Sequence, residues 1–401
     1  MSDFKRKESR QPTVYFRPPT KIKPLGIYVH IPFCQRKCNY CDFYSVCDLK
    51  QSDRYIDALI KQFEDYSGAA DRYCVDTVYI GGGTPSILKK KQIKRLFSAL
   101  KKNFSIAEDA EITCEVNPVS ASKKMLKALK KQGVNRLSIG VQSADNTLLK
   151  KLGRLHTWED AVSTVETARK LKFQNISVDC MYALPGQSKE IFFDTLEKIV
   201  ALGTEHISLY SLKVEKNTPF YEIKDSLDLP DEDSEIDMYF GAIDFLVKHG
   251  FHQYEISNFA KDSYECRHNL KYWNCEEYLG LGAAAASHYG NSRFTLVRDI
   301  KTYCDCVLGG TDEGLICEEY DAPINECVGD YVMLKLRTNS GINVSEFNTR
   351  FRGYDFEKLF GERLTPFVEK GLVEKSENVY YLNRKGFYVS NYILSTILDF
   401  D

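Results

Sequence analysis

The sequence has no long apolar run and almost no net charge. Its 54 Lys and Arg residues nearly balance 56 Asp and Glu residues, which leaves a formal net charge of -2. A chain so close to neutral has no overall field that attracts nucleic acid or an anionic membrane. No stretch approaches the roughly 18 consecutive apolar residues of a membrane span, and the first residues lack the apolar segment of a secretory signal. We therefore expect a cytoplasmic protein without a nucleic-acid partner.

One stretch is strongly biased, the amino-terminal arm, defined here as residues 1–25. Its basic residues outnumber Asp3 and Glu8 and are Lys5, Arg6, Lys7, Arg10, Arg17, Lys21 and Lys23. A charged terminal segment with few apolar side chains favours a solvated, flexible arm. Contact of the arm with a partner or with lipid head groups is the alternative.

The chain contains 13 Cys residues but lacks the two separated CxxC pairs that many zinc sites use. HIPFCQRKCNYC instead places Cys34, Cys38 and Cys41 at CxxxCxxC spacing. A zinc site here would need a distant Cys or His30 as its fourth ligand, and a redox dithiol would need only Cys38 and Cys41. A [4Fe-4S] cluster would take one thiolate on each of three irons and leave the fourth iron open to a non-protein ligand.

Short β-rich runs alternate with amphipathic helical stretches through much of the chain. The predicted strands are 26–31, 76–80, 110–116, 135–141, 175–184, 205–212 and 251–257. The predicted helices are 52–67, 90–104, 122–133, 158–171, 189–203 and 234–250. Repeated βα units predict an α/β fold with a parallel sheet and outer helices, closed into a full or partial TIM-like (β/α) barrel.

Unusual polar and glycine-rich features follow the predicted strands. They are the cysteine loop, GGGTPS at residues 81–86, Glu115 with Asn117, Gln142, Asp179, and Tyr210 with Ser211. In parallel barrels the carboxyl ends of the strands meet at one rim, and chemistry gathers there. We therefore expect these features to share one rim, which core packing alone would not arrange.

The cysteine motif, with the aromatic Tyr40 just before its last thiol, resembles the signature of the radical S-adenosylmethionine (radical SAM) enzymes. The resemblance implies that Cys34, Cys38 and Cys41 hold a [4Fe-4S] cluster. It also implies that S-adenosylmethionine chelates the open iron and is cleaved to methionine and a 5′-deoxyadenosyl radical. GGGTPS would contact the methionine amino group, because glycines let backbone groups approach a ligand closely.

The motifs YVHIPFC, GGGTPS, EVNP, RLSIGVQS, GRLHT, LPGQ, HISLYSL, YEISNFA and HNLKYW occur in an order similar to that of one branch of this superfamily. The branch contains oxygen-independent coproporphyrinogen III oxidase (HemN) and the heme chaperone HemW. By motif position, the resemblance implies a first S-adenosylmethionine lined by Tyr28, Gly82, Glu115 and Ser211. The oxidase binds a second S-adenosylmethionine molecule. The residues at the matching motif positions in this chain are Tyr40, Gly83, Thr84, Gln142, Arg154 and Asp179.

Two departures from the oxidase pattern favour a heme chaperone. The oxidase has a fourth cysteine two residues after the third, whereas here Asp42 and Phe43 follow Cys41. The chain also contains HNLKYW, which matches the HNxxYW motif associated with heme in HemW and nominates His268 as a heme contact. A structural His268, or Cys266 as a soft ligand, are alternatives. The resemblance implies a heme-accepting protein, such as a membrane cytochrome, and an electron donor as partners, and it leaves a homodimer open. Coproporphyrinogen oxidation is the second candidate, and no catalytic residue is assigned.

The pattern changes near residue 291. Residues 26–290 are predicted to form the barrel with the HNxxYW extension. Residues 291–401 are predicted to form helices, a short β pair and a final amphipathic helix, which resembles the winged-helix-like C-terminal domain of the HemN and HemW branch. This segment lacks a dense basic patch, so DNA binding is not expected.

Overall fold

The computed structural model describes residues 22–68, 72–290 and 292–398. Most of the amino-terminal arm, residues 1–21, lies outside the described residues. The end of the arm, from Lys23, already belongs to the first strand of the large sheet.

Twelve strands of the described chain form one sheet in the order β12-β11-β10-β9-β1-β2-β3-β4-β5-β6-β8-β7. The strands from β9 through β6 in this order run parallel, and the strands on both flanks are antiparallel. The central strands are β1 (Lys23–Ile31), β2 (Tyr73–Gly82), β3 (Ile106–Val116), β4 (Arg136–Gln142), β5 (Asn175–Tyr182) and β6 (His206–Ser211).

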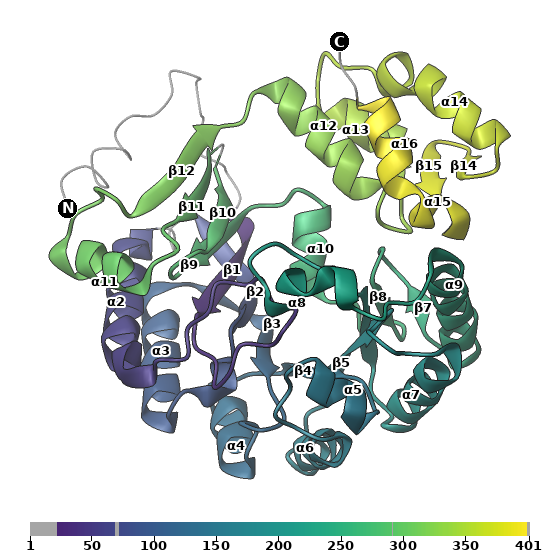
Figure 1. The fold of residues 1–401 in the computed structure, drawn as a ribbon. Coiled ribbons are helices and arrows are strands. Elements are labelled where there is room, and N and C mark those ends of the chain that lie inside the picture. Colours follow the sequence, from purple (N-terminus) through teal and green to yellow (C-terminus); the bar gives the residue numbers. More distant parts are fainter. Residues whose placement is uncertain (1–21, 69–71, 291, 399–401) are drawn as a thin grey trace.

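Helices cover the outside of this sheet. They are α2 (Ser52–Asp65), α3 (Lys90–Asn103), α4 (Lys123–Gln132), α6 (Trp158–Lys170), α7 (Lys189–Ala201) and α9 (Glu232–Lys248). The short α5 (Asn146–Lys151), which follows β4, contributes Leu148 to a satellite apolar cluster with Phe220. The short α8 (Pro219–Glu222) lies between β6 and α9 in the chain. Figure 1 shows the strands and helices as an open arc and not as a closed ring, which confirms the predicted partial barrel.

Strand β1 shows why the sheet forms where the sequence predicts it. Leu25, Ile27, Val29 and Ile31 are all completely buried in the main core, beneath the outer helices. Successive side chains of a strand point to opposite faces, so Tyr28 and its alternate neighbours face the inside of the arc. The inner face is therefore the polar and aromatic one.

The predicted seventh strand, 251–257, does not join the parallel series. Only β7 (His252–Gln253) is extended, and it pairs antiparallel with β8 (Asn258–Ala260) at the edge of the sheet. The segment between them turns toward the C-terminal unit, where Ile256 N donates to Arg337 O at 3.1 Å and Glu255 forms a β-bridge with Thr338. Tertiary contact therefore overrides the strand pattern here.

The sheet extends further along the sequence than the barrel motifs. It adds β9 (Tyr278–Leu281), β10 (Ala286–Tyr289), β11 (Ser292–Leu296) and the exposed edge strand β12 (Ile316–Asp321), with α11 (Ile300–Gly309) packed on α2. Helix α10 (Arg267–Trp273), which contains the HNLKYW motif, lies between the arc and the C-terminal helices (Figure 1).

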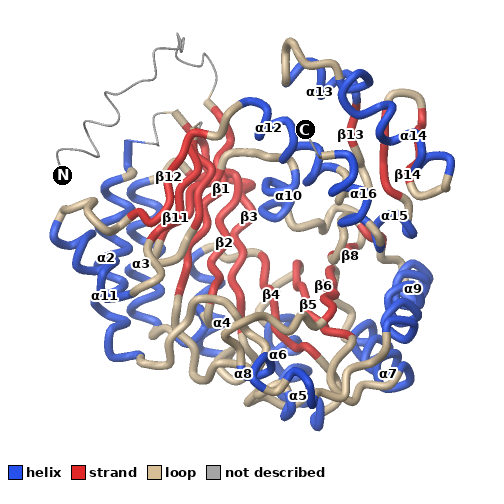
Figure 2. Tube along the Cα trace, turned by 45° about the horizontal axis from the view of Figure 1, so that its top comes forward, coloured by secondary structure: helices blue, strands red, loops and turns tan. Residues whose placement is uncertain are grey.

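A second hydrophobic core gathers side chains from Val328 to Ile397. Its helices are α12 (Ile324–Lys335), α13 (Val344–Arg350), α14 (Glu362–Glu369), α15 (Arg384–Tyr388) and α16 (Ser390–Ile397), around a small sheet of β13 (Ile342–Asn343), β15 (Val379–Leu382) and β14 (Val373–Ser376). Figure 2 shows this C-terminal unit beside the open side of the arc. By its packing the unit begins after Asp321, later than residue 291, because residues 292–321 still belong to the large sheet.

None of the helices in the described part of the chain has the length and apolar character needed to cross a membrane.

Candidate functional site

The cysteine loop begins directly after β1 and is closed at its base. Cys34 N donates to Val46 O at 2.9 Å, and Val46 N donates to Pro32 O at 2.8 Å. A second anchor lies in mid-loop, where Asn39 N donates to Leu152 O at 3.0 Å. These bonds fix both the base and the middle of the loop that carries the three predicted cluster thiols.

The thiols are partly buried and two of them receive hydrogen bonds. Thr84 Oγ1 donates to Cys34 Sγ, and Arg154 Nη1 donates to Cys38 Sγ, each at 3.6 Å. Burial raises the pKa of Cys41 to about 11, and the neighbouring Cys38 and Cys34 add to that rise. A thiol must lose its proton to bind metal, so nearby donors and a cationic iron would both favour the thiolate.

Within residues 22–68, 72–290 and 292–398, no three His, Cys, Asp or Glu side chains converge as on a single metal ion. A [4Fe-4S] cluster takes one thiolate per iron, and the donor set of this loop fits that group. His30, the alternative fourth zinc ligand, is engaged on both ring nitrogens. Nδ1 lies 3.0 Å from Tyr28 Oη and Nε2 lies 2.9 Å from Tyr44 O.

The glycine segment packs its backbone against the base of the cysteine loop. Gly83 N donates to Ile31 O at 2.9 Å, and Thr84 N donates to Phe33 O at 2.7 Å. A Cβ on Gly83 would lie 2.7 Å from Phe33 O, and a Cβ on Gly82, where φ is +105°, would lie 2.5 Å from His30. These close approaches require glycine.

Two carboxylates from neighbouring parts of the rim face the inside of the arc. Glu115 accepts from Tyr79 Oη at 2.9 Å and from Gly82 N at 3.1 Å. Burial and the nearby Asp179 raise the pKa of Glu115 to about 7. Asp179 accepts from Ser138 Oγ at 3.1 Å, and burial raises its pKa as well. A cationic ligand would stabilise the ionised form of both groups.

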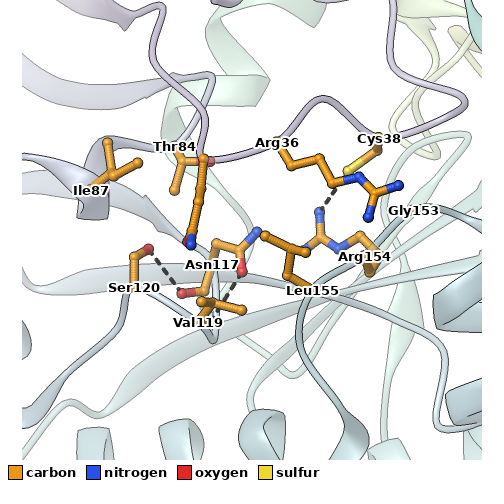
Figure 3. Close-up of a pocket in the computed structure, with 11 residues that line it drawn as sticks. Arg36, Cys38, Thr84, Ile87, Asn117, Val119, Ser120, Gly153, Arg154 and Leu155 are labelled. Carbon is orange, nitrogen blue, oxygen red and sulfur yellow. Dashed lines mark hydrogen bonds between the residues drawn. The ribbon is translucent and has the colours of Figure 1, made fainter. Parts of the chain in front are cut away.

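A small cavity opens beside Cys38, and we call it the thiol-side cavity. Its lining includes Thr84, Asn117 and Arg154 as well as Cys38, and Figure 3 shows the Arg154 guanidinium pointing at the thiol. Arg154 Nη2 donates to Gly140 O at 2.5 Å, whereas its Nε is buried without a hydrogen-bond partner in the described structure. An orphaned buried donor beside a cavity fits a site that is completed by a polar ligand.

The other predicted rim residues, Gln142, Tyr40 and Ser211, lie in three different surroundings. Gln142 ends β4 in a left-handed conformation with φ of 72° and is buried close to Arg154 and Gly140. Tyr40 packs instead against a satellite apolar cluster that contains Phe220. Ser211 donates to Glu235 on α9 at 2.5 Å, at the opposite end of the parallel series from β1.

A larger, open cavity of about 400 Å³ lies between the cysteine loop and the segment from α10 to β11, and we call it the aromatic cavity. Its lining is Tyr28, His30, Asp42, Phe43, Tyr44, Tyr272, Tyr278, Ala284, Ala286 and Arg298. The sequence motifs pointed to Tyr28 and Tyr272 here, but they missed Tyr44, Tyr278 and Arg298. No spacing signal marked those residues, and only the fold brings them to one cavity.

His268 does not line either cavity. It is completely buried, with Nδ1 at 2.8 Å from Thr77 Oγ1, Nε2 at 2.9 Å from Tyr272 Oη, and its ring stacked on Tyr79. Burial, with Lys271 nearby, lowers the pKa of His268 to about 3, so its imidazole is neutral. Both ring nitrogens have partners in this conformation, so a direct heme contact would require His268 to give up one of these hydrogen bonds, and its role in heme binding stays a prediction. Cys266, the other alternative, is also completely buried.

Comparisons with known proteins cover both parts of the chain. Residues 28–199 match the model of the radical SAM superfamily, and residues 330–389 match that of the HemN C-terminal domain. The heme chaperone HemW of Lactococcus lactis is 37% identical over 379 residues, which cover 94% of this chain and 98% of the relative. The heme chaperone HemW of Bacillus subtilis is 36% identical over 376 residues, which cover 92% and 98%.

Among solved structures, coproporphyrinogen III oxidase (HemN) from Escherichia coli, described as a radical SAM enzyme, superposes with a TM-score of 0.83. That chain is 25% identical, and the match covers 94% of this chain and 91% of that one. The sequence relationship extends over nearly the full length of the HemW relatives, and the fold agrees with that of the oxidase. The chain therefore belongs to the HemW family within the radical SAM superfamily.

Proposed function

We propose that this protein is a heme chaperone, which binds heme together with a [4Fe-4S] cluster and S-adenosylmethionine and delivers the heme to an acceptor protein. The observation that carries the proposal is the 37% identity to a heme chaperone HemW over 98% of that protein's length. A relationship this complete includes the C-terminal unit and the HNLKYW helix, which a shared barrel alone would not explain.

In this proposal Cys34, Cys38 and Cys41 hold the cluster. When bound, the cluster supplies the electron for reductive cleavage of the sulfonium of S-adenosylmethionine. The chain contributes hydrogen bonds from Thr84 to Cys34 and from Arg154 to Cys38, and these hold the two sulfurs in place. The backbone hydrogen bonds at its base and middle hold the loop in place after β1.

S-adenosylmethionine is proposed to lie along the rim, over Gly82 and Gly83. The absence of Cβ atoms lets this segment pack closely against His30 and Phe33 beside the cysteine loop. The Glu115 and Asp179 carboxylates lie on the same inner face and complement the positive charge of the ligand. Tyr28 and Ser211 belong to the proposed first site. Tyr40, Thr84, Gln142 and Arg154 belong, with Gly83 and Asp179, to the proposed second one.

The aromatic cavity is the proposed place for heme. Its volume of about 400 Å³ is within the usual range for small-molecule sites, and its lining combines several tyrosine faces with the exposed guanidinium of Arg298. Aromatic faces pack against a porphyrin plane, and a guanidinium pairs with a propionate carboxylate.

The remaining features of the proposal concern partners and place. We propose a cytoplasmic protein that receives electrons from a donor protein and passes heme to an acceptor such as a membrane cytochrome, with a homodimer as one form and without a nucleic-acid partner. The near-neutral charge of the chain supports the last point.

The test is hemin binding by anaerobically reconstituted full-length protein, followed by absorption spectroscopy. We expect about one heme per chain, and we expect Cys38→Ala to lose the cluster while Cys47→Ala keeps it. Cys47 is a matched control because it is an exposed cysteine close to the loop but outside the motif. A protein that binds no heme with its cluster intact would refute the proposal.

Coproporphyrinogen III oxidation is the second candidate, because the fold matches the oxidase at a TM-score of 0.83. Decarboxylation of added coproporphyrinogen III, with consumption of S-adenosylmethionine, would replace heme delivery as the function. We expect no decarboxylation, because Asp42 and Phe43 follow Cys41 in place of the oxidase's extra cysteine.

A further inference from the structure

The thiol-side cavity opens among apolar side chains that the protein leaves uncovered. Val119 is 42% exposed and Leu155 is 46% exposed, and both line the cavity together with Cys38. Figure 3 shows both side chains among those that line it. The cavity therefore leads from an exposed apolar surface to one of the predicted cluster thiols.

The surface around this opening is strongly basic. Four segments line or border the cavity and are here called the basic rim, residues 34–41, 83–91, 117–124 and 146–155. These segments contain no Asp or Glu. Their basic residues are Arg36, Lys37, Lys89, Lys90, Lys91, Lys123, Lys124, Lys150, Lys151 and Arg154. A chain with a net charge of -2 therefore concentrates positive charge around the path to Cys38.

Four of these lysines stand where helix electrostatics disfavour them. Lys90 and Lys91 begin α3, Lys123 and Lys124 begin α4, and neither first turn contains an acidic residue. The amino terminus of a helix carries partial positive charge and favours Asp and Glu, so exposed lysines there cost stability. Helix stability does not explain this placement, whereas a negatively charged partner does.

The acidic residues that border the basic rim do little to neutralise it. Asp53 lies 3.8 Å from Lys89 Nζ, at the limit of an ion pair. Asp145 accepts hydrogen bonds from two backbone N–H groups at the start of α5, and Asp42 lines the aromatic cavity instead. The positive charge of the rim therefore stays available to a partner in solution.

We propose that the basic rim is the docking surface for an acidic electron-carrier protein with a reduced flavin or iron–sulfur centre. The inference rests on the proposed function, which needs an electron donor, and it adds where the donor binds and what its surface is like. Opposite charge steers the donor to the rim, and Val119 and Leu155 form the apolar centre of the contact. One electron passes from the reduced centre of the donor to the proposed cluster beside Cys38. The donor is oxidised by one electron, and no bond forms or breaks.

The test titrates full-length, cluster-reconstituted protein with oxidised flavodoxin, an acidic flavin carrier, and measures Kd by calorimetry. An acidic plant-type ferredoxin is the second probe. We expect binding at low salt that is lost at about 0.5 M salt, where the screening length is only roughly 4 Å. We expect the double change Lys90→Glu with Lys91→Glu to raise Kd about tenfold.

The same helix supplies the matched control. Lys101 and Lys102 are exposed lysines in the last turn of α3, roughly 17 Å along the helix from the first pair. Changing both to Glu should leave Kd within about twofold of the wild type. Because glutamates suit the start of a helix, the variant at Lys90 and Lys91 should unfold at the wild-type temperature or higher, so its weaker binding does not come from misfolding.

A second variant extends the test across the cavity. Lys123→Glu with Lys124→Glu changes the neighbouring helix α4, and it should also weaken binding and slow the bleaching of cluster absorption by reduced flavodoxin. The inference is overturned if neither probe binds, if binding ignores salt, or if the rim and control variants bind alike. Tight binding of a short DNA duplex that the rim changes abolish would overturn it too. A protein that binds hemin but neither probe keeps the proposed function, and one that binds a probe but no hemin loses it, so the two failures are distinct.

Discussion

Arg154 donates to Cys38 at 3.6 Å through one amino group and to Gly140 O at 2.5 Å through the other. The guanidinium therefore joins the cysteine loop, which follows β1, to the end of β4. It therefore positions the Cys38 sulfur and places a positive charge beside it.

Replacing Arg154 with Gln should make the protein bind the proposed cluster less tightly. The thiolate would lose a charged donor, and we expect iron to be lost to a chelator about tenfold faster. Iron content and absorption after anaerobic reconstitution measure this. Arg36→Gln is the control, because Arg36 lines the same cavity but is exposed. Equal rates for the two variants would contradict the role given to Arg154.

Glu115 makes the apoprotein's stability depend on pH. Its pKa is raised to about 7 in the folded chain by burial and by Asp179, above its ordinary value of 4.5. The folded state therefore holds the proton more tightly, and this contribution is fully present below about pH 4.5 and lost as the pH rises through 7. Glu115→Gln removes the dependence. From pH 5 to pH 8 the Tm of the wild type should fall relative to the Tm of the variant. A Tm difference that does not change with pH would contradict the raised pKa of Glu115.

Gly83→Ala should disturb the junction between the glycine segment and the cysteine loop. The added Cβ would lie 2.7 Å from Phe33 O, and backbone atoms on both sides would have to move. We expect a loss of about 1–3 kcal/mol in the free energy of unfolding, measured by urea denaturation. Gly309→Ala is the control, because nothing lies within 4 Å of its Cβ position, and it should be neutral or slightly stabilising.

Arg350→Ala should loosen the end of α10. The side chain donates to the carbonyls of Asn274 and Cys275, and its guanidinium carbon lies 5.0 Å from the centroid of the Tyr331 ring. Hydrogen–deuterium exchange of residues 267–275 should rise, because local opening no longer has to break these bonds. Arg352→Ala, an exposed neighbour, should leave the exchange unchanged. If the two variants exchange alike, the C-terminal unit does not hold α10.

The parallel strands and the residues at their carboxyl ends could be predicted from the sequence, because both follow from local patterns. Alternating apolar residues place Leu25 and Ile27 in the core, and the carboxyl ends of consecutive parallel strands lie along one edge, where Glu115 and Gln142 are found. The triple-cysteine spacing is local as well. These features needed no knowledge of distant contacts.

The environment of His268 could not be predicted in this way. Its hydrogen-bond partner Thr77 lies 191 residues away in the sequence. Nothing in HNLKYW indicates that a side chain of a distant strand will form a hydrogen bond with Nδ1 of the imidazole. The prediction of a parallel strand at residues 251–257 was wrong for the same reason. Glu255 is buried against the C-terminal unit and does not join a parallel sheet. Long-range packing decided both.

The edge strand β12 is almost entirely exposed, and its sequence is Ile-Cys-Glu-Glu-Tyr-Asp. An unpaired strand edge is a template for joining another chain, and proteins commonly protect such edges with charge. A second copy approaching this edge would bring its own acidic segment, Glu318, Glu319 and Asp321, close to the same segment of the first copy. Among the described residues β12 is the last strand on its side of the sheet, and we expect repulsion between these carboxylates to disfavour pairing of two copies along this edge.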